Sequence, residues 1–467
     1  MSISRRQFLR TSSAVALGFY GLRHCLAENS WAQSATLAVD GLVPDPAKIF
    51  DLAPGYSYKI ISRGATVMTD GFRVPGAMDG MAAFAGANGK TIVVRNHELN
   101  PNQLDAGPFG LKNELLGKLN QTNLYDFGKG KTPGLGGTTT LVYDTRTKTL
   151  EKEFLSLAGT HRNCAGGPTP WGSWITCEET NARADVANGG TVEQDHGYNF
   201  EVPATSEIKL AQPIALKAMG RFNHEAVAVD PKTGIVYQTE DRLEGLIYRF
   251  IPTVPGKLTQ GGKLQALVIR DKNSADTRNW EFDKRFPQGT TFDVEWMDMN
   301  EIDAPKDDLR FRGHGAGAAV FARGEGMWAG NVKGQTAIYF ACTNGGSSKK
   351  GQIWRYWPSA QEGQAGEKAA SGKLELYLEP NDGHLIDNAD NLTVAPWGDI
   401  VLSEDGAAPN GLVRVTSAGK FHRFARNVMN DSELAGVTFS PDGSTLFFNI
   451  QNPGLTLAIT GPWQKPL

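Results

Sequence analysis

One pattern recurs six times along this chain and limits what it can fold into. In each copy a polar or acidic residue begins a short apolar strand, a glycine-bearing turn follows, and a second strand ends in polar residues. The copy from Glu225 to Asp241 is the clearest, with its turn at Gly234. A single hairpin cannot bury both of its faces, so such units must stack on one another around an axis. The repeat therefore predicts an all-β fold, a six-bladed β-propeller.

The spacing of the turns shows that the blades are unequal. The six turn glycines stand at positions 89, 172, 234, 334, 398 and 443, and glycine makes up 54 of the 467 residues. Apolar runs ending at Gly, Asp, Asn or Pro are typical of an all-β chain with tight turns. The uneven gaps predict inserted loops, the largest and most polar near 257–310, within a single propeller domain spanning 36–467. The alternative is a β-sandwich whose hairpins happen to resemble one another.

The first 35 residues are expected to be an export signal rather than part of the fold. Arg5 and Arg6 form a twin-arginine signal before an apolar stretch at 14–22, which is too short to span a bilayer. Small residues at 27–35 offer a cleavage region. We therefore expect the twin-arginine export machinery as a partner and a periplasmic or secreted location. This pathway carries folded proteins, often with a metal or cofactor inside. The alternative is an ordinary basic N-terminus.

Composition and motifs exclude several classes of function. The 47 basic and 50 acidic residues leave a formal net charge of −3, so nothing favours nucleic-acid binding. After the signal, the sequence contains no segment that we expect to insert into a membrane, and we expect a monomer. The chain lacks the Gly-x-Ser-x-Gly and Walker-type motifs, which leaves serine-triad and nucleotide-switch mechanisms without support.

The repeat also predicts where polar side chains gather. The first residue of one strand of a hairpin and the last residue of the other lie at the same end. The leading residues are therefore expected to form a ring at one mouth: Asp79, Cys164, Glu225, Glu325, Asn391 and Glu433. The trailing residues would surround it: Glu98, Glu179, Glu240, Asp241, Glu404 and Asp405. Carboxylates packed this closely repel one another unless cations separate them. The pattern predicts a metal centre; the alternative is a set of solvated loop ends.

The residue types indicate which metals. Carboxylate and amide oxygens suit Ca²⁺, whereas a Cys164 thiolate among them points to a transition ion such as iron or zinc. The alternative for Cys164 is a small core residue, which is what we expect of Cys177 and Cys342. Cys25 would leave with the signal, so an odd number of cysteines remains.

Three further side chains stand beside the predicted ring. Arg323 precedes Glu325 by two residues, which would place its guanidinium near the ring. The planar shape of this group suits a phosphate oxyanion. The alternative is a structural salt bridge. His97 and His224 each precede a glutamate, and strand alternation turns them away from it, so we expect packing or supporting roles for both histidines.

At these residues the chain resembles the PhoX-type alkaline phosphatases. The similarity covers most of the mature chain and rests on these segments: 95–98, 163–167 with 171–179, 220–225 with 239–241, Arg323 with Glu325, 390–391, 403–405 and 433–463. The resemblance implies a secreted propeller that hydrolyses small phosphomonoesters with Ca²⁺ and Fe³⁺ at one mouth. It also implies metal ligands at Cys164, Glu179, Glu225, Glu325, Glu433, Glu98 and at Asp390 or Asn391. Arg323 would then bind the substrate phosphate.

Two other hypotheses remain at this point. One is a calcium-dependent propeller that hydrolyses another ester, such as a phosphodiester, phytate or a lactone. The other is a non-enzymatic secreted propeller in which calcium is structural. Cys164 and Arg323 separate these hypotheses from the first, because a purely structural calcium site needs neither a thiolate nor a guanidinium.

Overall fold

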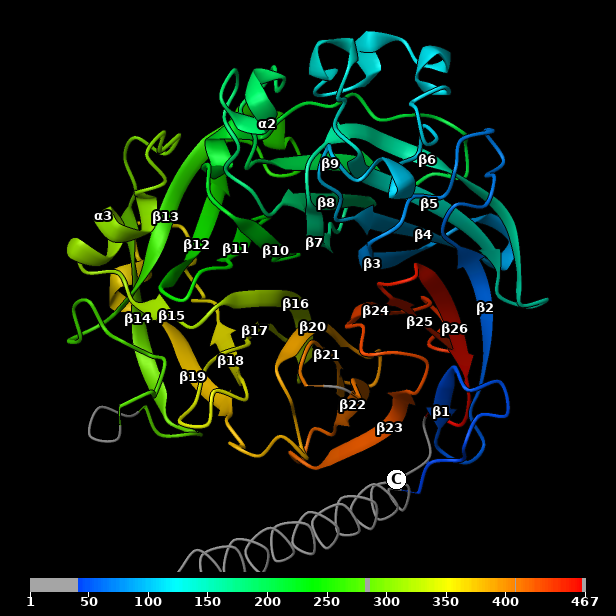
Figure 1. The fold of residues 1–467 in the computed structure, drawn as a ribbon. Helices are drawn as coiled ribbons and strands as arrows, with labels where there is room; N and C mark the ends of the chain where they lie inside the picture. The colour runs from blue at the N-terminus through cyan, green and yellow to red at the C-terminus, as the bar shows by residue number, and fades with distance from the viewer. Residues whose placement is uncertain (1–40, 282–285, 408, 464–467) are drawn as a thin grey trace, which may run out of the picture.

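The computed structural model describes residues 41–281, 286–407 and 409–463. The predicted signal at 1–35, with Arg5, Arg6 and Cys25, lies outside the described residues. Within them the chain is all-β, and its sheets surround a common centre as in a propeller (Figure 1).

Four of the sheets are small and antiparallel. The first contains β3 (Met78–Ala85), β4 (Lys90–His97), β5 (Gly136–Asp144) and β6 (Thr149–Thr160). The next contains β7 (Asn163–Pro168), β8 (Ser173–Glu178) and β9 (Asn199–Pro203). A third runs from β20 (Ala389–Val394) through β21 (Ile400–Glu404), β22 (Gly411–Val415) and β23 (Phe421–Asn427) to β1 (Phe50–Leu52). The fourth runs from β24 (Leu434–Phe439) through β25 (Thr445–Ile450) and β26 (Leu455–Thr460) to β2 (Ser57–Arg63).

The fifth sheet has ten strands and two innermost ends. One half contains β10 (His224–Val229), β11 (Val236–Glu240), β12 (Gly245–Pro252), β13 (Gly262–Ile269) and β14 (Thr291–Asp298). The other half contains β16 (Gly324–Val332), β17 (Gln335–Cys342), β18 (Gln352–Trp357) and β19 (Gly372–Leu378), and β19 pairs with β14. The two-residue strand β15 (Val320–Phe321) pairs with β12. The segment 257–310 thus contributes β13 and β14 besides its loops.

Within the described residues the helices are short and lie in the connections between strands. The α-helices there are α2 (Ala187–Gly190) and α3 (Leu309–Gly315). The 3₁₀ turns are η1 (Ala87–Gly89), η2 (Leu104–Ala106), η3 (Leu116–Lys118), η4 (Gln121–Asn123), η5 (Gly128–Gly130), η6 (Lys217–Met219), η7 (Leu258–Gln260) and η8 (Glu367–Ala369). Among the helices of the described ranges, none is long and apolar enough to cross a membrane.

Six strands form the innermost ring. They are β3, β7, β10, β16, β20 and β24, which pack side by side in this order, and β24 packs against β3 to close the ring (Figure 1). Each begins a hairpin, and the six turn glycines predicted from the sequence all have positive φ, between 70° and 97°. Glycine adopts this conformation without the steric penalty that a β-carbon brings. The sequence prediction of these six turns is therefore confirmed.

The inner strands approach one another closely because small residues face the axis. A β-carbon on Gly80 would lie 2.6 Å from the Cα atom of Ala165, and one on Gly326 would lie 2.6 Å from the carbonyl oxygen of Asp390. At Gly436 it would lie 2.4 Å from the carbonyl oxygen of Asp79. Only glycine fits at these contacts, and the close packing brings the starts of the six strands to one point.

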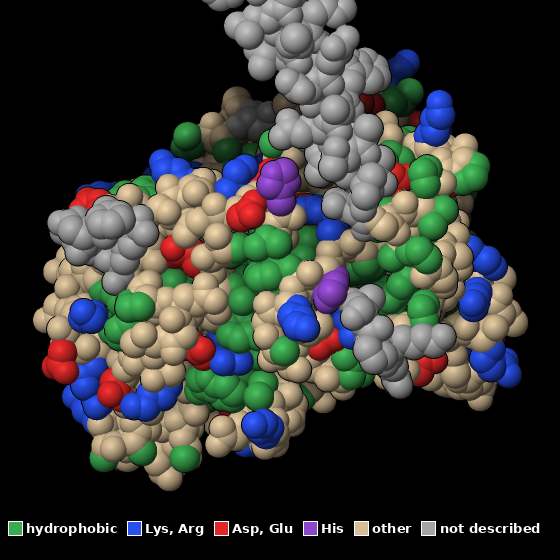
Figure 2. Space-filling view, turned by 90° about the horizontal axis from the view of Figure 1, so that it is seen from below, with side chains coloured by type: hydrophobic (Ala, Val, Ile, Leu, Met, Phe, Trp, Pro, Cys, Tyr) green, Lys and Arg blue, Asp and Glu red, His purple; other side chains and the backbone are tan. Residues whose placement is uncertain are grey.

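The surface carries charges of both signs. Figure 2 shows Lys and Arg side chains interspersed with Asp and Glu on one edge of the molecule, with apolar side chains between them. This mixture agrees with the small net charge of the sequence.

Candidate metal centre

A backbone hydrogen bond repeats at one mouth of the ring. In all six inner hairpins the N–H of the residue after the second strand donates to the carbonyl of the residue before the first, over 2.9–3.3 Å. The pairs are Glu98 with Ala77, Glu179 with Arg162, Asp241 with Asn223, Thr343 with Arg323, Asp405 with Asn388 and Gln451 with Glu433. The bond fixes both flanking residues of each hairpin at the same height around the axis.

Acidic side chains from these positions enclose a cavity of about 190 Å³. Its walls contain nine carboxylates, one thiol and two guanidinium groups: Asp79, Glu98, Glu179, Glu225, Asp241, Glu325, Asp390, Asp405 and Glu433, with Cys164, Arg162 and Arg323. Most come from two repeated positions, either the second residue of an inner strand or the residue after its partner strand. Since two guanidinium groups cannot balance nine carboxylates, the donor set fits cations.

The cavity offers three overlapping groups of ligand atoms, each within 4.8 Å of one another. They are Asp79–Glu98–Cys164, Cys164–Glu179–Glu225 and Glu225–Glu325–Asp390. Cys164 and Glu225 each belong to two groups, so each could contribute a ligand atom to either group. The thiol of Cys164 lies 3.7 Å from Asp79 Oδ2.

Several of these oxygens have no protein partner. Among the described residues, none donates a hydrogen bond to Asp79 Oδ1 or to either carboxylate oxygen of Glu225, although these atoms are buried. Buried polar atoms are nearly always paired, so unpaired carboxylate oxygens of this kind fit a cation-binding site.

Burial and mutual repulsion control protonation here. Burial, followed by the charges of neighbouring carboxylates, raises the pKa of Asp79, Glu225 and Asp390 well above the usual range. Burial also raises the pKa of Glu179 to about 8 against the opposing charge of Arg162, and that of Glu433 to about 10. The pKa of the Cys164 thiol is raised for the same reasons. Without cations, protons would have to neutralise this cavity.

The two arginines are held by the same carboxylates. Arg323 donates from Nε and Nη2 to Asp241 over 2.8 and 2.9 Å, and its Nη2 lies 2.5 Å from Glu325 Oε1. Arg162 forms ion pairs with Glu98 and Glu179 and donates from Nε to the Glu179 carbonyl over 3.0 Å.

Comparison with known proteins places the chain in a family. The family model of alkaline phosphatase PhoX matches residues 37–148 and 134–454. The chain belongs to the PhoX alkaline phosphatase family. No curated protein sequence matched the chain.

One solved structure agrees with the fold. Pseudomonas fluorescens PhoX, in complex with vanadate as a transition state analogue, is 16% identical, with a TM-score of 0.63 over 89% of this chain and 96% of that one. A gluconolactonase from Xanthomonas campestris is 12% identical over 88% of this chain and 98% of that one, with a TM-score of only 0.38.

The sequence-predicted residues of this PhoX family member fall into two classes. Eight of them line the cavity: Cys164, Glu179, Glu225, Glu325, Glu433, Glu98, Asp390 and Arg323. Asn391 lies one residue further along β20 and is not part of the lining. Its Oδ1 accepts from the Gly436 N–H over 2.6 Å, and its Nδ2 donates to Asp390 Oδ2 over 3.1 Å. Asn391 therefore orients Asp390 and connects β20 to β24.

Two of the expected trailing residues point away from the cavity. Glu240 accepts from the Tyr248 hydroxyl over 2.9 Å, and Glu404 accepts from the backbone N–H groups of Asp387 and Gly411, each over 2.9 Å. In each pair the next residue, Asp241 or Asp405, lines the cavity instead. Strand alternation explains the division, since neighbouring side chains face opposite sides.

The two histidines also lie outside the cavity lining. His97 hydrogen-bonds the Gly76 carbonyl and Thr139, each over 2.9 Å, and His224 bonds the Gly220 carbonyl over 3.0 Å. Burial lowers the pKa of both imidazoles, so they are neutral packing groups.

Sequence reasoning missed Arg162. A signal for it existed, because Arg162 precedes the strand of Cys164 by one residue, as Arg323 precedes the strand of Glu325. Both take positive φ, 46° and 55°. Comparing the residues before each strand, and not only the leading residues, would have found it.

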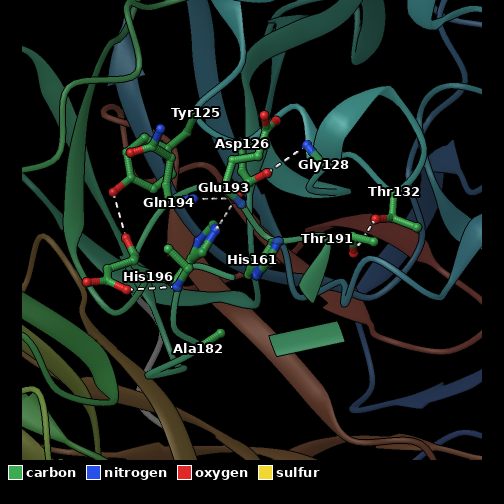
Figure 3. Close-up of polar contacts among 12 residues, drawn as sticks. Tyr125, Asp126, Gly128, Thr132, His161, Ala182, Thr191, Glu193, Gln194 and His196 are labelled. Carbon is green, nitrogen blue, oxygen red and sulfur yellow. Dashed lines mark hydrogen bonds and ion pairs between the residues drawn. The ribbon is translucent and has the colours of Figure 1, made fainter. Parts of the chain in front are cut away.

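A buried charged bridge supports the wall at Arg162 and Glu179. The Nε2 of His196 is 3.3 Å from Asp126 Oδ2 (Figure 3). Its Nδ1 is 2.6 Å from Glu178 Oε1. Glu178 also accepts from the His161 N–H over 2.9 Å. We call Asp126, His196 and Glu178 the His196 bridge. It fixes the backbone on both sides of the cavity wall, since His161 precedes Arg162 and Glu178 precedes Glu179.

Proposed function

We propose that this protein hydrolyses phosphomonoesters at a mixed Ca²⁺–Fe³⁺ centre in the cavity. The observation that carries the proposal is the donor set, in which a buried thiol stands among nine carboxylates with two guanidinium groups at the edge. Oxygen donors suit Ca²⁺, whereas a sulfur donor selects a transition ion. Family membership supports phosphate esters as the substrate class.

The residues of the cavity take distinct roles in this proposal. Eight side chains would hold the cations: Cys164, Glu179, Glu225, Glu325, Glu433, Glu98, Asp79 and Asp390. Bound cations would neutralise the substrate phosphate and supply the oxygen nucleophile. Arg323 binds a phosphate oxygen and stabilises the charge that develops on it. Asp241 and Glu325 position the Arg323 guanidinium for this task.

The proposal also includes the number of blades and the location of the protein. We propose six blades, with the ten-stranded sheet made of two blades that pair at β14 and β19. We also propose that residues 1–35 direct twin-arginine export and that the mature protein, residues 36–467, is a monomeric periplasmic or secreted enzyme.

The decisive experiment measures metals and activity together. Protein purified without chelator is expected to contain both calcium and iron, to absorb visible light, and to hydrolyse a phosphomonoester such as p-nitrophenyl phosphate. A phosphodiester and a lactone are the comparison substrates. Calcium without iron, combined with faster turnover of either comparison substrate, would contradict the proposal in favour of another calcium-dependent hydrolase.

Export is tested separately. Replacing Arg5 and Arg6 with lysine should leave the precursor in the cytoplasm, because the export machinery reads the arginine pair. The measurement is the amount of processed protein in the periplasmic and cytoplasmic fractions. Unchanged processing would show that another route carries the chain.

A further inference from the structure

Arg162 and Arg323 occupy the same position in two of the six repeats. Each directly precedes an inner strand, and each carbonyl accepts the repeated backbone hydrogen bond at the mouth. Their side chains are equally exposed, 31% and 30%. Each pairs with two carboxylates of the cavity: Glu98 and Glu179 for Arg162, Asp241 and Glu325 for Arg323.

The two guanidinium groups also leave the same atom without a protein partner. In both arginines Nε and Nη2 make the contacts to the cavity wall. Across the described ranges no residue accepts a hydrogen bond from Nη1 of either arginine. A guanidinium held rigidly on one side, with donors remaining on the other, is prepared for an oxyanion.

The two arginines flank one group of ligand atoms. Arg162 pairs with carboxylates of the first and second repeats, and Arg323 pairs with those of the third and fourth. Between them in the ring stand Cys164, Glu179 and Glu225, which form one of the three ligand groups. A tetrahedral anion over this group would have a guanidinium on either side.

We propose that Arg162 is a second phosphate-binding residue, which together with Arg323 holds the substrate phosphate from two sides. This inference rests on the proposed phosphatase function. It assigns to Arg162 a contact with the substrate in addition to its ion pairs with Glu98 and Glu179. The His196 bridge fixes the backbone before Arg162 and so sets the direction of its side chain.

The test measures, by calorimetry, the direct binding of inorganic phosphate to metal-loaded protein. Arg162→Gln is expected to raise the dissociation constant about 10- to 100-fold, the size expected for loss of a charge-assisted hydrogen bond. The steady-state KM of a phosphomonoester should rise with it. The matched control is Arg270→Gln, because Arg270 is also 30% exposed and pairs with Glu295 outside the cavity. This variant should bind phosphate as the wild type does.

Two further variants separate binding from a structural role. If Arg162→Gln loses its metals, Arg162→Lys keeps the charge beside Glu98 and Glu179 but lacks the second Nη donor, and the same titration is made with it. Adding guanidinium ion to Arg162→Ala should restore part of the phosphate affinity. Wild-type phosphate affinity in the metal-loaded Gln or Lys variant would overturn the inference. A wild-type protein that binds phosphate yet cleaves no phosphomonoester would instead contradict the proposed function alone.

Discussion

At the scale of single residues, the proposal of a transition ion depends on Cys164. Its thiol lies in two of the three ligand groups, whereas Cys177 and Cys342 are fully buried among apolar side chains. Burial and the nearby carboxylates raise the pKa of Cys164, so the thiolate needs a cation beside it to form. In the proposed centre this soft donor would bind the transition ion.

The Cys164→Ser variant tests this assignment. Serine keeps the volume but removes the thiolate, so iron content and phosphatase rate should fall together while calcium changes less, because the oxygen ligands remain. Metals per folded chain and the rate are measured for this variant and for Cys177→Ser. The second substitution places the same change in the core and should leave the metals bound, at a cost of about 1–3 kcal/mol in stability. Full iron and activity in Cys164→Ser would show that another ligand binds the transition ion.

At the scale of strands, the close approach at the axis determines where the ligands stand. In each inner strand the register against its partner shifts by one residue after the first few positions, as between Met78 and Met81 or between Gly324 and Met327. In five of the six strands the second residue faces the cavity beside this shift, whereas in β24 the cavity residue is Glu433, directly before the strand. Asp390, and not Asn391, is that second residue in β20.

The Gly326→Ala variant tests the role of this packing. The added β-carbon would meet the Asp390 carbonyl oxygen at 2.6 Å and the Asn391 Cα atom at 2.7 Å, and backbone atoms cannot rotate away. We expect a loss of roughly 1–3 kcal/mol or more in stability, with reduced metal binding because Asp390 is displaced. Thermal denaturation and metal analysis measure both effects. Gly315→Ala, at the end of α3 with nothing within 4 Å of the new carbon, should change neither quantity.

The His196 bridge makes the connections around the cavity sensitive to alkaline pH. Burial alone would lower the pKa of His196, but the charges and hydrogen bonds of Glu178 and Asp126 raise it to about 9. Because the folded pKa exceeds the ordinary value of 6.5, the charged imidazole stabilises the fold fully below about pH 6.5. This contribution is lost as the pH rises through about 9.

Comparison with His196→Gln isolates this effect. The variant should be less stable than the wild type by on the order of 3 kcal/mol at pH 6, and the difference should shrink between pH 8 and pH 10. Thermal midpoints across this range provide the measurement, with the exposed His384→Gln as a control. A difference that stays constant with pH would mean that His196 is not charged in the folded protein.

At the scale of the whole molecule, much of the ring could be predicted from sequence, because its determinants are local. Each hairpin contains its own turn glycine and polar ends, and all six turns were found. The position of Arg162 before its strand was a local signal, but its pairing with Glu98 and Glu179 was not, because these two residues come from two hairpins that only the closed ring brings together. The choice between Asp390 and Asn391 was also left open, since a one-residue register shift exchanges the two faces of a strand.

The chain ends provide a second feature that periodicity could not predict. The early strands β1 and β2 are the outermost strands of the two sheets formed by the C-terminal segments. Phe50 of β1 is buried and its ring lies 4.7 Å from that of Phe448 in β25. These pairings join residues about 400 positions apart, and no local pattern in the sequence indicates them.

The closed ring couples metal binding to the stability of the entire molecule. The cavity gathers carboxylates from all six inner hairpins, so bound cations connect the hairpins, whereas the metal-free ring contains carboxylates that repel one another. Ions that bind only the folded state stabilise it by mass action, by roughly 2.7 kcal/mol at a concentration 100 times the dissociation constant.

Prolonged treatment with chelator should therefore lower the thermal midpoint and abolish phosphatase activity. Calcium and iron added back together should restore both, whereas calcium alone should restore more stability than activity. Full activity after chelation, in protein shown by elemental analysis to be free of metal, would rule out the metal centre. Charge-removing variants such as Glu225→Gln should narrow the gap in thermal midpoint between metal-free and metal-loaded protein, since fewer carboxylates then need a cation.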